Sequence, residues 1–456
     1  MDLGFETCGN ATLIAYDAGV PVVVTDPWVQ GAQYFGSWTL PYRFSAAQME
    51  AFAAARYVWL SHGHPDHLNL DSLALFRHKT LLVADHRGGR IVTDLKAAGY
   101  NVQVLENHCW TQLSNRVRSL TCADQNQDAA LLVALGECCA VLNLNDGSAI
   151  GNRLKLKASL RPFSRRFVLR LLGGGGADMI NLFTEDGRRI EPMPAERPPL
   201  GFAYGRLLND WQGTHTAPFS CHHAFARTDS RWAAAYETPI EAHGRSFKQE
   251  RGEFIPGYFS YDVAADRSTL TPMEAAPRAY REPREFGDDW SEPLTSADLQ
   301  TVRDYFRKFE HLQRKFQFIN LRVGARDNFV DLGGPRGRGI TFEAPRNSLM
   351  IAVRYEIFDD LLIGNFVKTV LHGGVRSLYP DFTPYVAKYG DNGRAFSADE
   401  LDNYFQGYRD ESGLQEWLEY VRVKSTRKVR RAVLATLSGT PVLYRTARSA
   451  YRRFIA

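Results

Sequence analysis

The sequence has few cysteines and no long hydrophobic run. The six cysteines show no CxxC pair and no regular spacing; they are Cys8, Cys109, Cys122, Cys138, Cys139 and Cys221. This pattern argues against a disulfide-rich secreted scaffold and favours reduced thiols in a cytoplasmic protein. No apolar run approaches the roughly 18 residues that a membrane-spanning helix needs. Residues 1–6 have neither a basic nor an apolar segment, so we expect no secretory signal.

The chain also lacks a strong net charge. Its 55 Lys and Arg against 51 Asp and Glu leave +4 over 456 residues, which is too little to suggest a nucleic-acid-binding protein. The charge is unevenly distributed, because residues 421–456 hold ten basic and no acidic residues, so the preceding residues carry about −6 (+4 minus +10). This basic tail is predicted to be helical. We expect it either to bind an anionic membrane surface or an acidic partner, or to cover an acidic part of its own chain.

The order of elements favours an α/β fold. The first 150 residues alternate short β-branched runs with helical segments, which is typical of a central sheet covered by helices. Ser45–Gln48 and Ser397–Glu400 have the spacing of capping boxes and predict two helix starts. The apolar run Ser348–Val353 is predicted to be a strand. Gly173–Gly176 is not a phosphate-binding loop, because no Gly-Lys-Ser/Thr follows it.

One cluster of side chains carries chemistry. Ser61–His67 reads Ser-His-Gly-His-Pro-Asp-His and directly follows the apolar run Tyr57–Leu60, a predicted buried strand. It holds three imidazoles and one carboxylate, which are His62, His64, His67 and Asp66. Imidazole binds zinc, iron and manganese, and a carboxylate beside it suits a second, harder metal position. The sequence therefore predicts a metal site at the end of this strand.

This motif resembles that of the metallo-β-lactamase superfamily, and Val24–Trp28 resembles the early strand and loop that lead into its site. The resemblance implies an αββα sandwich with a dinuclear metal centre. It also implies that His62 and His64 bind one ion and that Asp66 and His67 bind the other. Asp146, in Asn143–Gly147, matches the carboxylate that bridges the two ions. Asp66 and Asp146 are then the catalytic carboxylates.

Two further ligands are less clearly marked. Family members usually supply a third histidine near residues 124–128, but this segment has none. Asp124 is our choice to replace it, with Asp128 as the alternative. For the last histidine we choose His223, followed by His222 and then by His215 and His243.

Within the superfamily, the sequence is similar to CMP-N-acetylneuraminate hydroxylase without its Rieske domain. The likeness includes Asn143–Asp146, Pro218–Ser220 and Tyr355–Asp360. Cys221 and His223 have one Cys-x-His spacing, but no Cys-x-x-His follows them. An oxygenase of this kind would therefore need an external electron donor.

Together these features predict three regions and three candidate functions. We expect a metal-binding domain at 1–245, a C-terminal elaboration that shapes the substrate site at 246–420, and the basic helical tail at 421–456. The first function is an oxygenase that hydroxylates a small organic or sugar-like substrate with two divalent ions, iron being favoured and zinc or manganese the alternatives. The second is a hydrolase of an ester, lactone, amide or phosphoester that uses a metal-bridging hydroxide. The third is a non-catalytic binding protein. The expected location is the cytoplasm, with possible peripheral attachment to a membrane.

Overall fold

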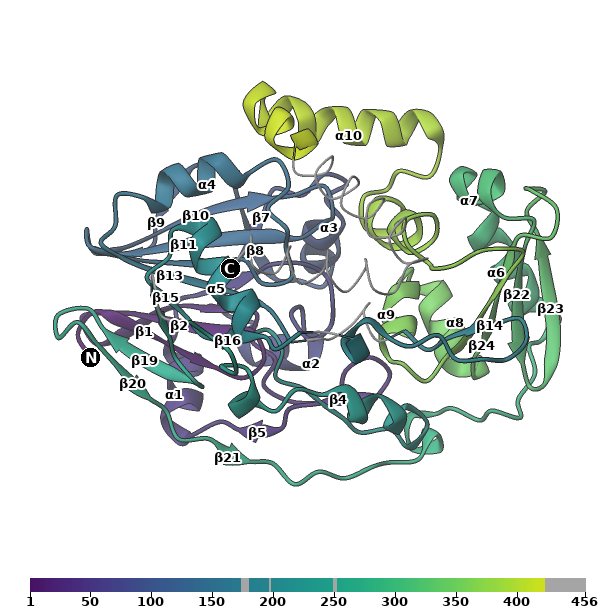
Figure 1. The fold of residues 1–456 in the computed structure, drawn as a ribbon, viewed down its shortest axis with the longest axis horizontal. Helices are drawn as coiled ribbons and strands as arrows, with labels where there is room; N and C mark the ends of the chain where they lie inside the picture. Colours follow the sequence, from purple (N-terminus) through teal and green to yellow (C-terminus); the bar gives the residue numbers. More distant parts are fainter. Residues whose placement is uncertain (174–179, 197, 249–251, 423–456) are drawn as a thin grey trace, which may run out of the picture.

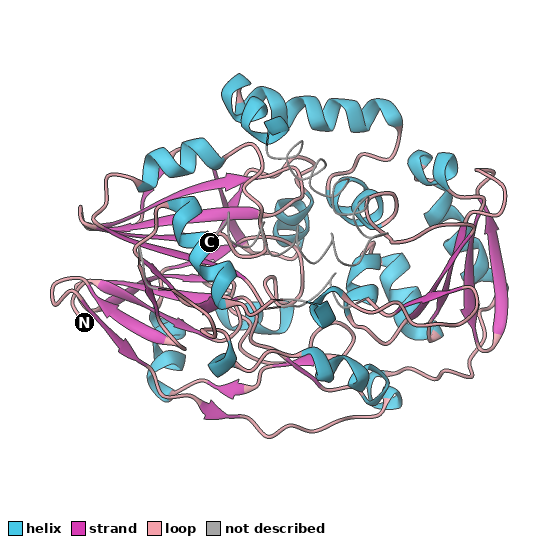
Figure 2. Ribbon diagram, in the orientation of Figure 1, coloured by secondary structure: helices cyan, strands magenta, loops and turns pink. Residues whose placement is uncertain are grey.

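Two large β-sheets form the main body of the protein (Figures 1 and 2). The computed structural model describes residues 1–173, 180–196, 198–248 and 252–422. The first sheet has the order β20(Arg267–Leu270)-β19(Phe259–Asp262)-β1(Gly4–Cys8)-β2(Thr12–Asp17)-β3(Val20–Thr25)-β6(Tyr57–Leu60)-β7(Thr80–Ala84)-β8(Asn101–Leu105). The second has the order β18(Glu253–Phe254)-β15(His215–Thr216)-β13(Arg165–Leu171)-β12(Cys139–Asn143)-β11(Ala129–Leu135)-β10(Val117–Ala123)-β9(Trp110–Gln112), and β16(Pro218–Phe219) also pairs with β13.

Three hydrophobic cores show how these sheets are layered. The largest lies between the sheets and includes Phe5 and Phe167. A second core packs α1(Ala46–Ala54), α2(Leu70–Leu73) and α3(Arg90–Ala97) on the outer face of the first sheet. A third packs α4(Arg153–Leu160) and α5(Gly201–Trp211) on the outer face of the second sheet. The predicted αββα sandwich is therefore confirmed.

The central strands explain why the sequence favours this arrangement. Every residue of β11 is buried, because Leu131, Val133 and Leu135 face the inter-sheet core while the alternate residues face the outer helices. The capping box predicted at Ser45 is also confirmed: the Ser45 hydroxyl accepts from the Gln48 backbone, and the Gln48 side chain accepts from the Ser45 backbone.

A second body has its own sheet and core. Its five strands have the order β14(Leu182–Thr184)-β25(Lys368–His372)-β24(Gly339–Glu343)-β22(Phe318–Val323)-β23(Arg326–Asp331). The helices α6(Ser296–Arg307), α7(Glu310–Lys315), α8(Arg346–Arg354) and α9(Phe358–Ile363) pack on this sheet. The strand predicted at Ser348–Val353 is wrong, because this run lies inside α8 and places Leu349, Ala352 and Val353 in the core at helical spacing.

The chain crosses between the two bodies more than once. β18–β20 follow residue 245 yet extend the sandwich sheets, and β14 precedes residue 245 yet belongs to the five-stranded sheet. The π-helix η7(Pro384–Asn392) leads to α10(Ala398–Ser412), which packs Tyr404 and Tyr408 against the sandwich core. The capping box at Ser397 and Glu400 is confirmed at the start of α10.

The remaining strands are short. β17(Ala224–Phe225) pairs with β4(Trp38–Thr39), and β21(Glu274–Ala275) pairs with β5(Tyr42–Arg43). Most of the predicted basic tail, residues 423–456, and most of the Gly173–Gly176 run lie outside the described residues. Within the part of the chain that is described, no helix combines the length and apolarity needed to cross a membrane.

Candidate metal centre

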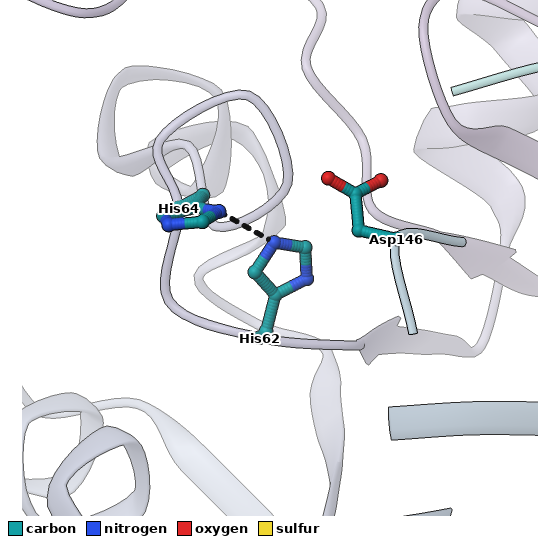
Figure 3. A group of neighbouring side chains, drawn as sticks. All are labelled: His62, His64 and Asp146. Carbon is teal, nitrogen blue, oxygen red and sulfur yellow. Dashed lines mark hydrogen bonds between the residues drawn. The ribbon is translucent and has the colours of Figure 1, made fainter. Parts of the chain in front are cut away.

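Two loops from opposite sheets meet at one edge of the sandwich. One follows β6 and carries His62 and His64; the other follows β12 and carries Asp146 (Figure 3). One ring nitrogen from each histidine and one oxygen of Asp146 lie within 4.8 Å of one another. Because each loop starts at the end of a buried strand, the sheets hold these side chains in fixed relative positions.

His67 and Asp66 lie next to this group. His67 Nε2 is 3.4 Å from Asp66 Oδ2 and 3.6 Å from Asp146 Oδ1. The Ser220 hydroxyl donates to Asp146 Oδ1 over 2.7 Å. Asp66 in turn accepts hydrogen bonds from Asn10 and Tyr34. Asp146 therefore lies between the His62–His64 pair and the Asp66–His67 pair.

Asp26 organises the histidines from behind. It is fully buried and accepts from the Ser61 backbone at 2.8 Å, the Ser61 hydroxyl at 2.7 Å, His67 Nδ1 at 3.0 Å and Asn145 Nδ2 at 2.6 Å. Such outer partners fix the ring orientation and tautomer of metal-binding histidines. Asp26 had not been predicted as a site residue. The one feature of the sequence that could have marked it is its position directly after the buried strand β3, within Val24–Trp28.

The hydrogen bonds indicate which ring nitrogens face the centre. The Ser61 hydroxyl donates to Asp26, so it accepts from His62 Nδ1 at 2.9 Å. His64 Nε2 donates to Asp359 at 3.1 Å. In these tautomers, lone pairs of His62 Nε2 and His64 Nδ1 face each other across 2.9 Å, an arrangement that is repulsive unless a proton or a metal ion lies between them.

The same reasoning applies to His67. Its Nδ1 donates to Asp26, so the lone pair on Nε2 faces the carboxylates of Asp66 and Asp146. A proton or a metal ion is needed there as well. Three imidazole nitrogens and two carboxylates are suitable ligands for divalent transition metals, so the described residues fit a two-metal centre.

The carboxylates give this region a negative potential. Burial opposes protonation of His64, but its hydrogen bond to Asp359 and the charges of Asp359 and Asp360 raise its pKa to about 9. Burial likewise opposes protonation of His67, and Asp66, Asp26 and Asp146 raise its pKa to about 10. The same carboxylates would also attract metal cations.

Asp124 and Asp128 lie at the turn between β10 and β11. Asp124 Oδ1 accepts from the Asn126 backbone at 2.8 Å, and its Oδ2 accepts from Ser148 at 3.2 Å. Burial and the charge of Asp128 raise the pKa of Asp124 to about 6. Asp128 lines the same cavity as His64, Asp66 and Asp146. Among the described residues, the groups of three or more possible ligands include neither Asp124 nor Asp128.

The four candidate histidines near residue 223 pack against other side chains of the sandwich. The His223 ring stacks on Trp38 with 3.5 Å between centroids, and His215 stacks on Phe167. His222 packs edge-on against Tyr258, and His243 is bonded to the Tyr204 hydroxyl. These four rings lie outside the group formed by His62, His64 and Asp146. Ser220 is the residue of this segment that contacts both His67, at 3.3 Å, and Asp146.

The second body contributes polar groups to the same cavity, which has a volume of about 180 Å³. Asp359 and Asp360 are on α9, and one oxygen of each lies within 4.8 Å of a His64 ring nitrogen. Lys388, on η7, lies 3.8 Å from Asp128 Oδ2. Tyr34 and Trp38, from the sandwich, also line the cavity. Asp359 and Lys388 had not been predicted to lie at this site, although Tyr355–Asp360 contributed to the resemblance.

Comparisons with known proteins find distant structural similarity. Neither family models nor curated proteins match the sequence. Among solved structures, the chain is similar to CmlA, a diiron beta-hydroxylase from Streptomyces venezuelae, with 14% identity over 56% of this chain and 52% of that chain and a TM-score of 0.36. It is similar to an isothiocyanate hydrolase from Delia radicum gut bacteria, with 13% identity over 60% of this chain and 100% of that chain and a TM-score of 0.38.

A diphosphatase from the PhnP family gives 13% identity over 58% of this chain and 85% of that chain, with a TM-score of 0.31. The match to the diiron hydroxylase spans about half of that protein's length. In this chain, the layers of the sandwich and the position of the histidine motif at the end of β6 agree with the fold expected from the resemblance to the metallo-β-lactamase superfamily.

Proposed function

We propose that the protein is a dinuclear-metal oxygenase that hydroxylates a small organic or sugar-like substrate, with iron as its metal. The observation that carries this proposal is the large share of carboxylates at the site. Asp66 and Asp146 lie among the three histidines, and Asp128, Asp359 and Asp360 surround the same cavity or contact His64. Oxygen-rich ligand sets favour iron or manganese over zinc.

The residues divide between two metal positions. His62, His64 and Asp146 would hold one ion, Asp66 and His67 would hold the other, and Asp146 would contribute to both; the short distances from Asp146 to His62, His64 and His67 support this division. With iron bound, the pair would supply a centre at which O₂ can be reduced. Asp124 and His223 stay predictions as ligands. Because the sequence has no Cys-x-x-His after Cys221, electrons would come from an external donor.

The chain's own residues would position the substrate. The Lys388 ammonium faces the cavity beside Asp128, where it can attract an anionic group of a substrate. Tyr34 and Trp38 provide aromatic walls, and the Tyr34 hydroxyl holds Asp66 in place. Asp359 orients the His64 ring by accepting from its Nε2. A cavity of about 180 Å³ fits a small substrate or the reactive end of a larger one.

Lys388 also favours a second candidate, a metal-dependent hydrolase. A partly buried ammonium in the same cavity as the proposed metal ligands can stabilise the negative charge that develops on oxygen when an ester, lactone, amide or phosphoester is attacked. In that case zinc would be the expected metal, and no electron donor would be needed.

Metal content and gas consumption separate these functions. We expect the full chain purified from iron-supplied cells to hold two irons and to consume O₂ when a chemical reductant is added. His64→Ala should abolish O₂ consumption, whereas His78→Ala, at an exposed histidine, should not. If the protein instead holds two zinc ions, shows esterase or phosphodiesterase activity and takes up no O₂, the hydrolase function would be supported and the oxygenase function rejected. Full binding of an identified ligand by His64→Ala would favour a non-catalytic protein.

A further inference from the structure

A row of apolar side chains faces solvent on the helix that follows α10. Residues 414–422 are helical, and Leu414, Trp417, Leu418 and Val421 are spaced at i, i+3, i+4 and i+7. Their exposed fractions are 70%, 39%, 53% and 36%. We name these four residues the apolar stripe. A helix on the surface of a globular protein normally turns such a stripe toward the core, so its exposure needs a different explanation.

The opposite side of this helix holds it against the sandwich. Glu416 is buried and accepts from the Lys155 backbone at 2.8 Å, at the start of α4. Lys155 Nζ donates to the Glu411 backbone over 2.9 Å, and Glu419 lies 4.0 Å from Arg153. Because these polar contacts fix the rotation of the helix, Leu414, Leu418 and Val421 face away from α4 and are exposed. Trp417, at the edge of the apolar stripe, is partly exposed and also lines a cavity of about 380 Å³ with Phe405 and Tyr408. Figure 1 shows this helix beside α10, above α4.

Basic residues lie near the apolar stripe, and several of them are paired with acids. On α4, which packs on the opposite side of the helix and also exposes Leu154, Arg153 lies 3.6 Å from Asp210 and 4.0 Å from Glu419. Arg422, at the described end of the helix, is largely exposed and donates to Glu419. The sequence then continues with nine more Lys and Arg and no Asp or Glu to residue 456. In the sequence, the exposed leucines and tryptophan are therefore followed directly by a cluster of basic residues.

We propose that the apolar stripe docks on an anionic lipid bilayer. Amphipathic helices of this kind lie in the membrane interface, with leucine and tryptophan among the acyl chains and basic residues at the anionic headgroups. An acidic protein partner would explain the basic residues that follow the stripe, but it would not explain the exposed leucines. An anionic bilayer explains both the basic residues and the exposed leucines. The helix would lie parallel to the membrane surface and would attach the enzyme peripherally.

Flotation of the full-length protein with vesicles tests this proposal. We expect it to float with phosphatidylcholine vesicles that contain about 30% phosphatidylglycerol, and to stay in solution with phosphatidylcholine alone. L414E/L418E should lower the bound fraction by about tenfold or more, because two apolar anchors become acids. The matched control is V20E/L270E, which makes the same kind of change at two exposed apolar positions on β3 and β20. It should float like the parent.

A fluorescence measurement covers the case in which the variant misfolds. Addition of the anionic vesicles should shift the emission of the parent to shorter wavelength, and Trp417→Phe should remove most of that shift. Three results would overturn the proposal. They are no flotation of the parent, equal flotation of L414E/L418E and the control, and a shift that survives in Trp417→Phe. Loss of flotation in R427E/K428E/R430E/R431E alone, with L414E/L418E unaffected, would assign membrane binding to charge and not to the apolar stripe.

Discussion

The sandwich and the second body contribute to the cavity in different ways. In the sandwich, His62, His64 and Asp146 lie on loops that begin where buried strands end, and Asp26 braces them from behind. In the second body, Asp359 lies on the short helix α9 and Lys388 on the π-helix η7. The sandwich therefore carries the proposed ligand set, whereas the second body adds groups that bond to it or line the same cavity.

Because of this difference, we expect substitutions in the two bodies to have different effects on metal binding and on stability. If the sandwich alone holds the metals, substitutions in its loops should remove them, and substitutions in the second body should alter affinity only slightly. Each body also has its own core, so each should have its own stability.

The largest effect is expected from His64→Ala. His64 belongs to both groups of possible ligands among the described residues, and removing its imidazole takes a nitrogen donor from the centre of the site. The variant should lose at least one of the two ions and all metal-dependent activity. Elemental analysis of the purified chain would measure this loss, with His78→Ala as the control. An unchanged metal content would contradict the proposed ligand set.

The next largest effects are expected in the two cores. Leu131→Ala empties a site between the sandwich sheets, and Leu321→Ala does so in the five-stranded sheet; both side chains are fully or almost fully buried. Each should lower the free energy of unfolding by about 2–5 kcal/mol.

Urea denaturation with and without a chelator would show how the two bodies are coupled. Metal removal should lower the stability of the sandwich, because ions that bind only the native state stabilise it. Leu131→Ala should then lower the same transition further, and Leu321→Ala should act on a separate one. A single transition that both substitutions shift equally would mean that the two bodies unfold as one unit.

Much of the sandwich could be predicted from sequence, because its signals are local. β-branched runs, the capping box at Ser45 and the histidine motif each occupy a few consecutive residues. The strand predicted at Ser348–Val353 failed because six apolar residues fit either a buried strand or one side of a helix. Periodicity over the full length of α8 separates the two.

The site could be predicted only in part, for a similar reason. His62, His64, Asp66 and His67 could be predicted because they lie within seven consecutive residues. Asp146 was predicted from the family resemblance. Asp359 is 295 residues from its hydrogen-bond partner His64, and no local pattern encodes a contact between separate bodies. The domain boundary expected at 245 also stays a prediction. A cut at this residue would separate β14 from the other strands of the five-stranded sheet, and β18–β20 from the other strands of the sandwich sheets.

Asp26→Asn should have a smaller effect than either class above. The amide keeps the volume of the carboxylate but can accept fewer hydrogen bonds, and it removes the negative charge next to His67 Nδ1. Loss of such an outer partner typically weakens metal affinity by about 10–100-fold. Competition with a coloured chelator would measure this affinity. Asp17→Asn, another buried carboxylate of the first sheet, is the control, and equal affinities in the two variants would show that Asp26 has no special role.

The smallest effect is expected from Asp359→Asn, and it tests the comparison most directly. The carboxylate lies 3.1 Å from His64 Nε2 and acts on the centre through that ring. An amide oxygen can still accept this hydrogen bond, so we expect metal affinity to fall by less than about tenfold. The same chelator competition applies, with Asp327→Asn on β23 as the control in the second body. If Asp359→Asn instead lost its metal as completely as His64→Ala, Asp359 would be a ligand, and the centre would be assembled from both bodies.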